Sequence, residues 1–512
     1  MEALADTSWD VTISGTGLAQ SLLALALSRS GKKILHVDKN TYYGGSEAAF
    51  SLEEAREWAD SVNQDPRRGP FEDVSIHVPS TTSDGKKAAA SRAYTLSLSP
   101  FVVYTRSKLL PTLVSSRVYR QLEFQAVGSW WICGHSAASR LQRVPSSRED
   151  IFADDSISMK AKRMLIKFLR SINQPAQMGG DDKPVVEEDL DLPFPEYLTS
   201  RFNAPPELYD ALASLSLSQQ SPQQTSAKFA VPRIKRHLAS IGLFGPGFGS
   251  LVSRWGCGAE IAQVGCRALA VGGGVYVLGR GIQSIDAQKD EDGFHQVTLS
   301  DGEVIRSRYV VGSLWDLPVE ENGPRIATHK VARSISVVSS SLGRLFPPTA
   351  EGGPVPAGAV VVVPGQVLAG ETADAPPIHL LIHSSETGEC PNGQCVIYGS
   401  VSISGQEGQG LLQKAVDLLL ESFADSGDEP TVLWRLCFTQ IGSLDLTDSV
   451  DKIHRSSTSD QVLFFPPPSL DLAFDDEVVE SVRAGWKAVA GDEAHDDNDF
   501  MKFEDREDYD DD

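Results

Sequence analysis

The sequence lacks long hydrophobic runs. Its most continuous apolar stretches, residues 18–27 and 359–363, are shorter than the about 20 residues that a helix needs to cross a bilayer. A secretory leader, an Asn-x-Ser/Thr glycosylation site and a C-terminal lipidation motif are also missing. We therefore expect a soluble chain that resides in the cytoplasm.

Cysteine is scarce, with six residues among 512. No two are spaced as Cys-x-x-Cys, and none has histidines at zinc-site spacing, so we expect neither a metal nor a disulfide framework. Reduced and mostly buried thiols are expected instead. A Gly-x-Ser-x-Gly nucleophile motif is absent too, and nothing supports independent catalysis. The six are Cys133, Cys257, Cys266, Cys390, Cys395 and Cys437.

Positive charge is in short supply. The chain has 46 Lys and Arg against 69 Asp and Glu, a net charge of −23, which argues against nucleic-acid binding and against unaided binding to an anionic membrane. Residues 492–512 alone hold twelve carboxylates and two basic side chains. This tail is either a solvated disordered segment or a docking segment for a basic partner surface.

What the sequence does contain, over residues 9–45, is a strand, turn, helix, strand pattern typical of a βαβ unit. In a dinucleotide site, two glycines admit the pyrophosphate to the helix N-terminus and an acidic residue binds the ribose. Gly15, Gly17 and Asp38 fit this motif, whereas Gln20 stands where a third glycine is expected. The pattern predicts a parallel α/β sheet whose dinucleotide motif is incomplete.

The next hundred residues mix elements. Residues 51–62 open with a Ser-x-x-Glu capping box and predict a helix, and the polar residues 64–92 predict a mobile surface insertion. Further on, the pattern predicts a strand at 94–98, a helix at 108–116 and a strand at 118–127.

Residues 150–240 change character and predict an all-helical lobe. Apolar residues recur at helical spacing between basic ones in residues 150–172, and helical patterns continue at 187–202 and 207–217. Such a stripe either fills the core of its own bundle or opens around a flexible apolar ligand, and both readings stay open. The stripe comprises Ile157, Met164, Leu165, Phe168, Leu169 and Ile172.

Beyond residue 240, strands return. A helix at 259–270, hairpins over 283–310, later β-rich segments and a closing helix at 476–490 are predicted. Because strands resume late, the first domain is predicted to be discontinuous. The expected parts are the large domain (1–149 and 241–490), a helical insertion (150–240) and an acidic disordered tail (491–512).

Several segments together resemble the family of Rab GDP-dissociation inhibitors and Rab escort proteins. They are GTGLAQSLLALALSRSGKKILHVDKNTYYGG, VYRQLEF with VGSWW and VPSSRED, and AEIAQVGCRALAVGGGVYVL, followed by FFPPP. They occur in the family's order across the chain. The resemblance implies a flavoenzyme-like α/β domain that binds GDP-bound Rab GTPases, with a smaller helical domain that receives the Rab's geranylgeranyl lipid.

The family's Rab-binding residues map onto Tyr43, with Tyr42 adjacent, and onto Glu260, Gln263 and Arg267. The last three are spaced i, i+3 and i+7, so they share one helix face. Arginine and tyrosine are typical anchors of interfaces. Without the resemblance, the same residues would be interpreted as an ordinary solvent-exposed helix face.

The resemblance further implies an escort protein, which presents unprenylated Rab to the geranylgeranyltransferase α/β heterodimer and contacts membranes only transiently. Three features favour an escort protein over a recycling inhibitor: the segment SRSGKKILHVD, the polar insertion and the divergent helical lobe. We expect the Rab C-terminus on a patch of Leu109, Leu110, Leu113 and Val114, and the lipid near Met164, Leu165, Phe168 and Leu169.

A flavin-dependent amine oxidase-like enzyme is the remaining alternative. Such an enzyme needs a Gly-Asp ahead of its last helix to close on the flavin. Here residues 463–468 read LFFPPP, and Gly491-Asp492 follows that helix. With Gln20 in the glycine motif as well, we expect a vestigial FAD-binding fold without a bound cofactor.

Overall fold

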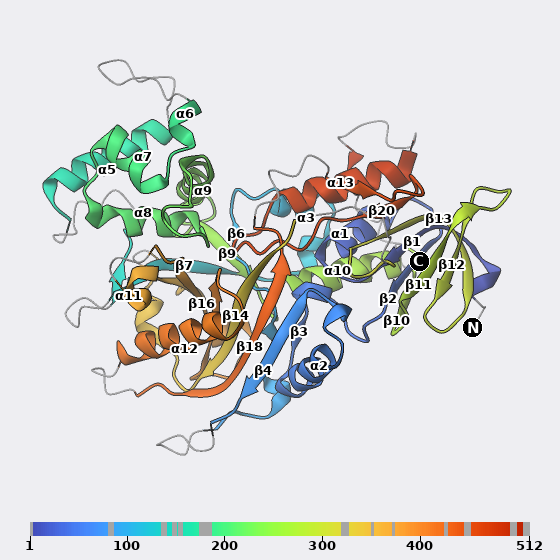
Figure 1. Cartoon of the computed structure of the whole chain (residues 1–512), viewed down its shortest axis with the longest axis horizontal. Coiled ribbons are helices and arrows are strands. Elements are labelled where there is room, and N and C mark those ends of the chain that lie inside the picture. The colour runs from blue at the N-terminus through green and yellow to red at the C-terminus, as the bar shows by residue number, and fades with distance from the viewer. Residues whose placement is uncertain are drawn as a thin grey trace, which may run out of the picture.

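The computed structural model describes residues 4–79, 87–134, 141–145, 151, 157–173, 187–318, 327–349, 353–370, 374–423, 429–444, 452–491 and 499–504. They form two large sheets and a two-stranded one, helices packed on each large sheet, and a further group of helices over one end of the second large sheet (Figure 1). Among the helices of this described part, none is both long and apolar enough to cross a membrane.

The first sheet is drawn from three distant parts of the sequence. Five of its eight strands, β10, β2, β1, β13 and β20, run parallel as neighbours, and the rest form antiparallel additions. The large domain is therefore discontinuous. The strands are β1 (Ser8–Ser14), β2 (Ile34–Asp38), β10 (Val275–Leu278), β11 (Ile282–Lys289), β12 (His295–Leu299), β13 (Val304–Gly312), β19 (His454–Arg455) and β20 (Val462–Phe464).

Three helices pack together beside this sheet: α1 (Leu18–Leu27), α10 (Gly258–Val271) and α13 (Glu477–Ala490). α1 is buried at all but one of its ten positions because α10 and α13 both cover it. A Cβ at Gly265 would lie 2.6 Å from the carbonyl oxygen of Ser21, so glycine is needed for α10 to approach α1. The βαβ unit is thus locked to α10 by close backbone contact.

The second sheet has ten strands in the order β4-β18-β14-β17-β16-β15-β7-β9-β6, with β8 on β7. Helix α12 (Gly405–Glu421) packs on it, and the short α11 (Gly365–Ala369) lies beside α12. The strands are β4 (Phe71–His77), β6 (Val103–Tyr104), β7 (Phe124–Cys133), β8 (Leu141–Arg143), β9 (Ser250–Ser253), β14 (His329–Val338), β15 (Gly358–Val363), β16 (Ile378–Ser384), β17 (Cys395–Val401) and β18 (Val432–Gly442). A small pair, β3 (Ala49–Phe50) and β5 (Leu96–Ser97), stands apart.

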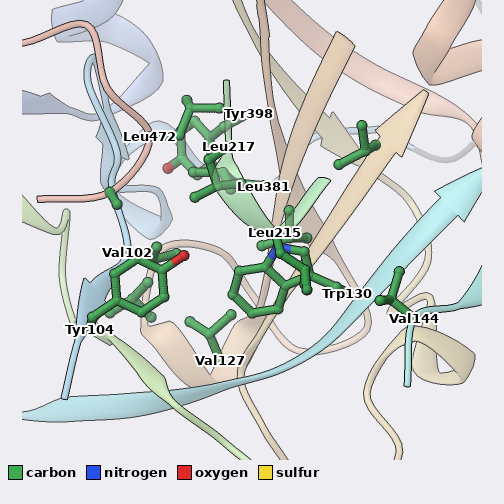
Figure 2. Close-up of a cluster of buried hydrophobic side chains, with 14 of the residues drawn as sticks. Val102, Tyr104, Val127, Trp130, Val144, Leu215, Leu217, Leu381, Tyr398 and Leu472 are labelled. Atoms are coloured by element: carbon green, nitrogen blue, oxygen red, sulfur yellow. The ribbon is translucent and has the colours of Figure 1, made fainter. Parts of the chain in front are cut away.

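The helical group shares one buried core with the second sheet. Leu215 and Leu217, from α8 and its end, belong to the same buried core as Val127 and Trp130 of β7, and Figure 2 shows Leu215 beside Trp130. Arg233 and Arg236 of α9 also form ion pairs with the C-terminal segment, which further attach the helical group to the rest of the chain. The group comprises α5 (Met159–Asn173), α6 (Glu187–Leu190), α7 (Phe194–Phe202), α8 (Tyr209–Ser216) and α9 (Ala227–Ser240).

Two expectations for residues 64–127 are wrong in part. Residues 71–77 are not part of a mobile insertion but form β4, which pairs with β18 and buries Phe71 and Val74. Residues 80–86 lie outside the described part. The strand expected from residue 118 starts later, because a 3-10 turn at Val118–Gln121 precedes β7.

The acidic tail is also not disordered throughout. Phe500 and Met501 are buried, and the ring of Phe500 packs against Trp486 of α13. The backbone N–H of Phe503 donates to the carbonyl of Ser115, and Arg29 lies over the Phe503 ring. Phe500, Met501 and Phe503 therefore attach residues 499–504 to the core of the large domain, whereas residues 492–498 and 505–512 lie outside the described part.

Helix α2 (Leu52–Gln64) begins with the predicted capping box. The Ser51 hydroxyl accepts the backbone N–H of Glu54, whose carboxylate accepts the N–H of Ser51. The helix buries Trp58 against Phe71 and Phe438. The cap thus fixes the start of a helix that covers the β4 edge.

We expect Ser51→Ala to lower the free energy of unfolding by about 1 kcal/mol, because it leaves an N-terminal N–H of α2 without its acceptor. Urea denaturation followed by tryptophan fluorescence measures the change. Ser61→Ala, in the same helix but away from the cap, should stay within about 0.5 kcal/mol of the parent. Equal effects of the two substitutions would contradict the capping role.

Candidate functional site

Helix α10 presents the three predicted contact residues on one surface. Gln263 and Arg267 are exposed and Glu260 is half-buried, while the positions between them face the interior. Burial raises the pKa of Glu260, and the nearby Arg267 opposes that rise. Arg267 also donates to the side-chain oxygen of Gln121 at 3.4 Å. The predicted face is therefore present, with its arginine accessible.

Of the two adjacent tyrosines, Tyr43 is the one at this surface. Its ring packs edge-on against Tyr276 of β10 at 6.2 Å between centroids. Tyr42 instead packs against Phe50 and the core of the second sheet, where burial raises the pKa of its hydroxyl. The structure therefore brings Tyr43 to the side of α10 and leaves Tyr42 a packing role.

A histidine links this surface to the glycine turn. The buried His36 has one ring nitrogen 2.9 Å from the Tyr276 hydroxyl and the other 2.6 Å from the carbonyl oxygen of Gly15. Burial lowers the pKa of His36 to about 4, so the ring is neutral at pH 7. Tyr276, on which Tyr43 packs, is thus tied to the turn after β1.

The sequence alone missed three features around the surface. Val271 and Val275 are 59% and 37% exposed, which adds apolar area at the end of α10 and the start of β10. Trp255, Gly256 and Cys257 all have positive φ, and this turn sets where α10 begins. Cys257 is fully buried and donates its thiol to the carbonyl of Phe101. A tryptophan and a cysteine around one glycine give no sequence signal for such a turn.

At the glycine turn, Asp38 is fully buried and bonded to the chain itself. Its carboxylate accepts the N–H and hydroxyl of Thr16 at 2.7 and 2.6 Å and the N–H of Asn40 at 2.7 Å. Burial, with the nearby Asp316, raises the pKa of Asp38 to about 6. The acidic residue that would bind a ribose is therefore occupied by backbone and hydroxyl donors.

Two further carboxylates approach the same turn. Glu47 accepts the backbone N–H of Leu18, the first residue of α1, at 3.0 Å. Asp316 accepts from Gln20 at 2.9 Å, and a Cβ on Gly15 would lie 2.4 Å from it. A pyrophosphate at this helix N-terminus would meet two carboxylates, so the residues present do not fit a dinucleotide.

A cleft runs from this turn between the two sheets. It is lined by the turn and by residues 465–469 of the Phe-Pro-rich segment, together with aromatic side chains. Lys39 bonds to the Trp315 carbonyl at the cleft wall and lies 3.8 Å from Asp316. The cleft thus lies where enzymes of this fold bind a nucleotide, but the carboxyl groups of Glu47 and Asp316 line its inner end.

The expected patch for the Rab C-terminus does not exist as a surface. Leu109, Leu110 and Leu113 of α3 (Leu109–Ser115) are buried in the core of the large domain, and only Val114, 51% exposed, faces outward. Their spacing is that of a short helix with one face on the core, which the sequence does not distinguish from an exposed apolar patch. The four residues therefore cannot act together as a docking patch in this conformation.

The residues expected near the lipid form the centre of the helical group. Met164, Leu165 and Phe168 are buried, and Leu169 is half-buried. Phe168 packs edge-on against Phe202 at 5.4 Å between centroids. The stripe therefore fills a closed core in this structure.

No group of three or more His, Cys, Asp or Glu side chains within the described residues could hold a metal ion. Five of the six cysteines are buried, as expected, and Cys437 is half-buried.

Several known proteins are similar in sequence to this chain. Residues 5–421 match the family described as GDI, GDP dissociation inhibitor. The Rab proteins geranylgeranyltransferase component A of Candida albicans is 30% identical over 76% of this chain and 59% of that protein. The Saccharomyces cerevisiae protein of the same name is 26% identical over 97% and 86%, and Arabidopsis thaliana Rab escort protein 1 is 25% identical over 96% and 94%. The chain thus spans less than two thirds of the Candida relative.

Solved structures with a similar fold include a Rab GDI and an oxidoreductase. The Rab GDI of Plasmodium falciparum matches with a TM-score of 0.65 at 18% identity, over 94% of this chain and 98% of that one. An oxidoreductase of Methanosarcina mazei matches with a TM-score of 0.56 at 11% identity, over 93% and 99%. These likenesses confirm the predicted flavoenzyme-like fold with its helical insertion. The family match covers most of the sequence, and the chain belongs to the GDP dissociation inhibitor family.

Proposed function

We propose that this chain is a Rab escort protein that binds GDP-bound, unprenylated Rab GTPases and presents them to the Rab geranylgeranyltransferase heterodimer. The observation that carries the proposal is the surface formed by Tyr43, Glu260, Gln263 and Arg267, in a family member whose relatives include proteins named component A of that transferase. A tyrosine and an arginine with an adjacent acid and amide supply anchors for a folded partner.

Selectivity for the GDP state follows from which parts of a GTPase move. The switch segments are ordered by the γ-phosphate and released without it, so a surface that contacts the released conformation favours GDP. On this chain, Arg267 offers an accessible guanidinium, and Val271 and Val275 offer apolar area next to it. The combination suits a partly apolar, partly charged switch surface.

The helical group is proposed to shelter the geranylgeranyl group after transfer. Twenty carbons at ~0.8 kcal/mol each make the lipid insoluble when exposed, so a carrier must bury it. Met164, Leu165, Phe168 and Leu169 supply the apolar core for this purpose. The transferase performs the thioether chemistry, and this chain contributes positioning and effective concentration.

We also propose that the chain is not itself an enzyme and holds no FAD. The carboxyl groups of Glu47 and Asp316 occupy the place where a pyrophosphate would bind, and Asp38 is already bonded to Thr16 and Asn40. A cytoplasmic protein that meets membranes only while delivering prenylated Rab fits this role.

Arg267→Ala is expected to weaken the affinity for GDP-bound Rab by about tenfold or more, because it removes a central charged anchor. Titration calorimetry with a purified Rab measures the change. Arg344→Ala, an exposed arginine beside α12 on the other sheet, is the matched control and should leave affinity unchanged. An affinity within about twofold of the parent for Arg267→Ala would refute the proposed surface.

Reconstituted prenylation distinguishes an escort protein from a recycling inhibitor. A Rab with C-terminal cysteines, labelled geranylgeranyl diphosphate and the transferase heterodimer are mixed with and without this chain. We expect label transfer only in its presence, because the transferase then receives a positioned substrate. Tight binding of already prenylated Rab-GDP without support of transfer would make the chain a recycling inhibitor instead.

Incubation with FAD provides the test against an oxidase. After gel filtration, the protein should show no flavin absorbance near ~450 nm, because carboxylates occupy the phosphate position. A yellow protein with a stoichiometric flavin would overturn the proposal that the cleft is vestigial.

A further inference from the structure

The N-terminus of α1 is capped from another segment. Gly17, the residue before the helix, has no side chain to accept the free N–H groups of the first turn. Glu47 reaches one of these groups instead: its carboxylate accepts the N–H of Leu18 at 3.0 Å, and the residue is 9% exposed. A buried helix end without an acceptor would be costly, so this contact is structurally significant.

The same residue supports the start of α10. A Cβ added to Gly258, the first residue of α10, would lie 3.0 and 3.2 Å from the Cβ and Cγ of Glu47. The α10 backbone therefore rests directly on the Glu47 stem. Two residues further along, Glu260 opens the proposed Rab-binding face.

Glu47 also ends the loop that carries Tyr43. It is the last residue of the 3-10 turn Gly45–Glu47, directly after Tyr42, Tyr43 and Gly44. A second contact holds the loop: the N–H of Gly44 donates to the Thr16 hydroxyl at 3.1 Å. Gly45 meets Gly17 so closely that a Cβ there would lie 3.1 Å from it.

We infer that Glu47 is a positioning residue of the Rab-binding surface: its carboxylate occupies the phosphate position of the old nucleotide site and thereby holds the Tyr43 loop against α10. The inference rests on the proposed function for what the surface binds, but its geometric part does not depend on the partner. A carboxylate satisfies the helix end as a phosphate group would, without a dissociable ligand.

Asp316 provides the matched comparison. It lies at the same turn and accepts from Gln20 and from the Ser313 hydroxyl. Its ion-pair partner is Lys39, and within the described part of the chain its side chain forms no hydrogen bond or ion pair with Tyr43 or with α10. Its removal changes the charge at the turn and breaks buried hydrogen bonds, but it should leave the Tyr43 loop and α10 in place.

The experiment compares Glu47→Ala, Glu47→Gln and Asp316→Ala in the full chain, each below its own unfolding temperature. For binding of purified GDP-bound Rab, we expect Glu47→Ala to lose about tenfold in affinity, and Asp316→Ala to stay within about threefold of the parent. Glu47→Gln should retain affinity within the same margin, because its amide oxygen can still accept the Leu18 N–H.

Hydrogen exchange supplies a second measurement that needs no partner. Glu47→Ala should speed exchange at residues 40–46 and 258–262 relative to the parent, while Glu47→Gln and Asp316→Ala should not. Unchanged exchange there in Glu47→Ala overturns the inference even if no Rab binds. If the parent binds Rab and Glu47→Ala binds it equally well, the inference also fails while the proposed function stands. A parent that binds no Rab refutes the proposed function, and exchange then decides the positioning role.

Discussion

A buried helix N-terminus has to be satisfied by an acceptor, and this constraint organises the large domain. Enzymes of this fold place the phosphates of a dinucleotide at the end of the first helix. Here Glu47 takes that place and Asp38 is bonded to Thr16 and Asn40. We propose that this position serves here as an internal joint between α1, the Tyr43 loop and α10 and not as a ligand site. The surface proposed to hold a GTPase thus lies next to the place where enzymes of this fold bind a dinucleotide.

The sequence predicted the parts of this arrangement that depend on local patterns. Short-range patterns in the sequence predict the βαβ unit, the capping box of α2 and the shared face of Glu260, Gln263 and Arg267, and the structure contains all of them. The discontinuous domain was predicted too, because strands return after the helical stretch. Glu47 could not be identified in this way, since its partners lie on segments far apart in sequence and a single loop carboxylate carries no pattern.

The wrong predictions share a physical origin. Strand β4 buries only Phe71 and Val74, with Ile76 half-buried, and its other residues are polar, as in many edge strands with one solvated face. Its average composition is therefore that of a loop. The tail read as disordered because its carboxylates outnumber Phe500, Met501 and Phe503, which dock it on the core. The spacing of the α3 leucines fits a surface patch as well as a buried helix face, and the structure buries all three. In each case, the prediction depends on the average composition of a segment, whereas a few buried side chains determine the structure of that segment.

The closed core of the helical group has a consequence for the proposed lipid carriage. Phe168 lies among Phe194 and Phe202 in a core continuous with the second sheet, so a lipid cannot enter without moving these side chains. Burying twenty carbons is worth roughly 16 kcal/mol, whereas removing one large side chain from a packed core costs roughly 3–5 kcal/mol. Burial of the lipid therefore exceeds the cost of displacing a single large core side chain. A core that closes when empty also keeps the protein from exposing apolar surface between cargoes.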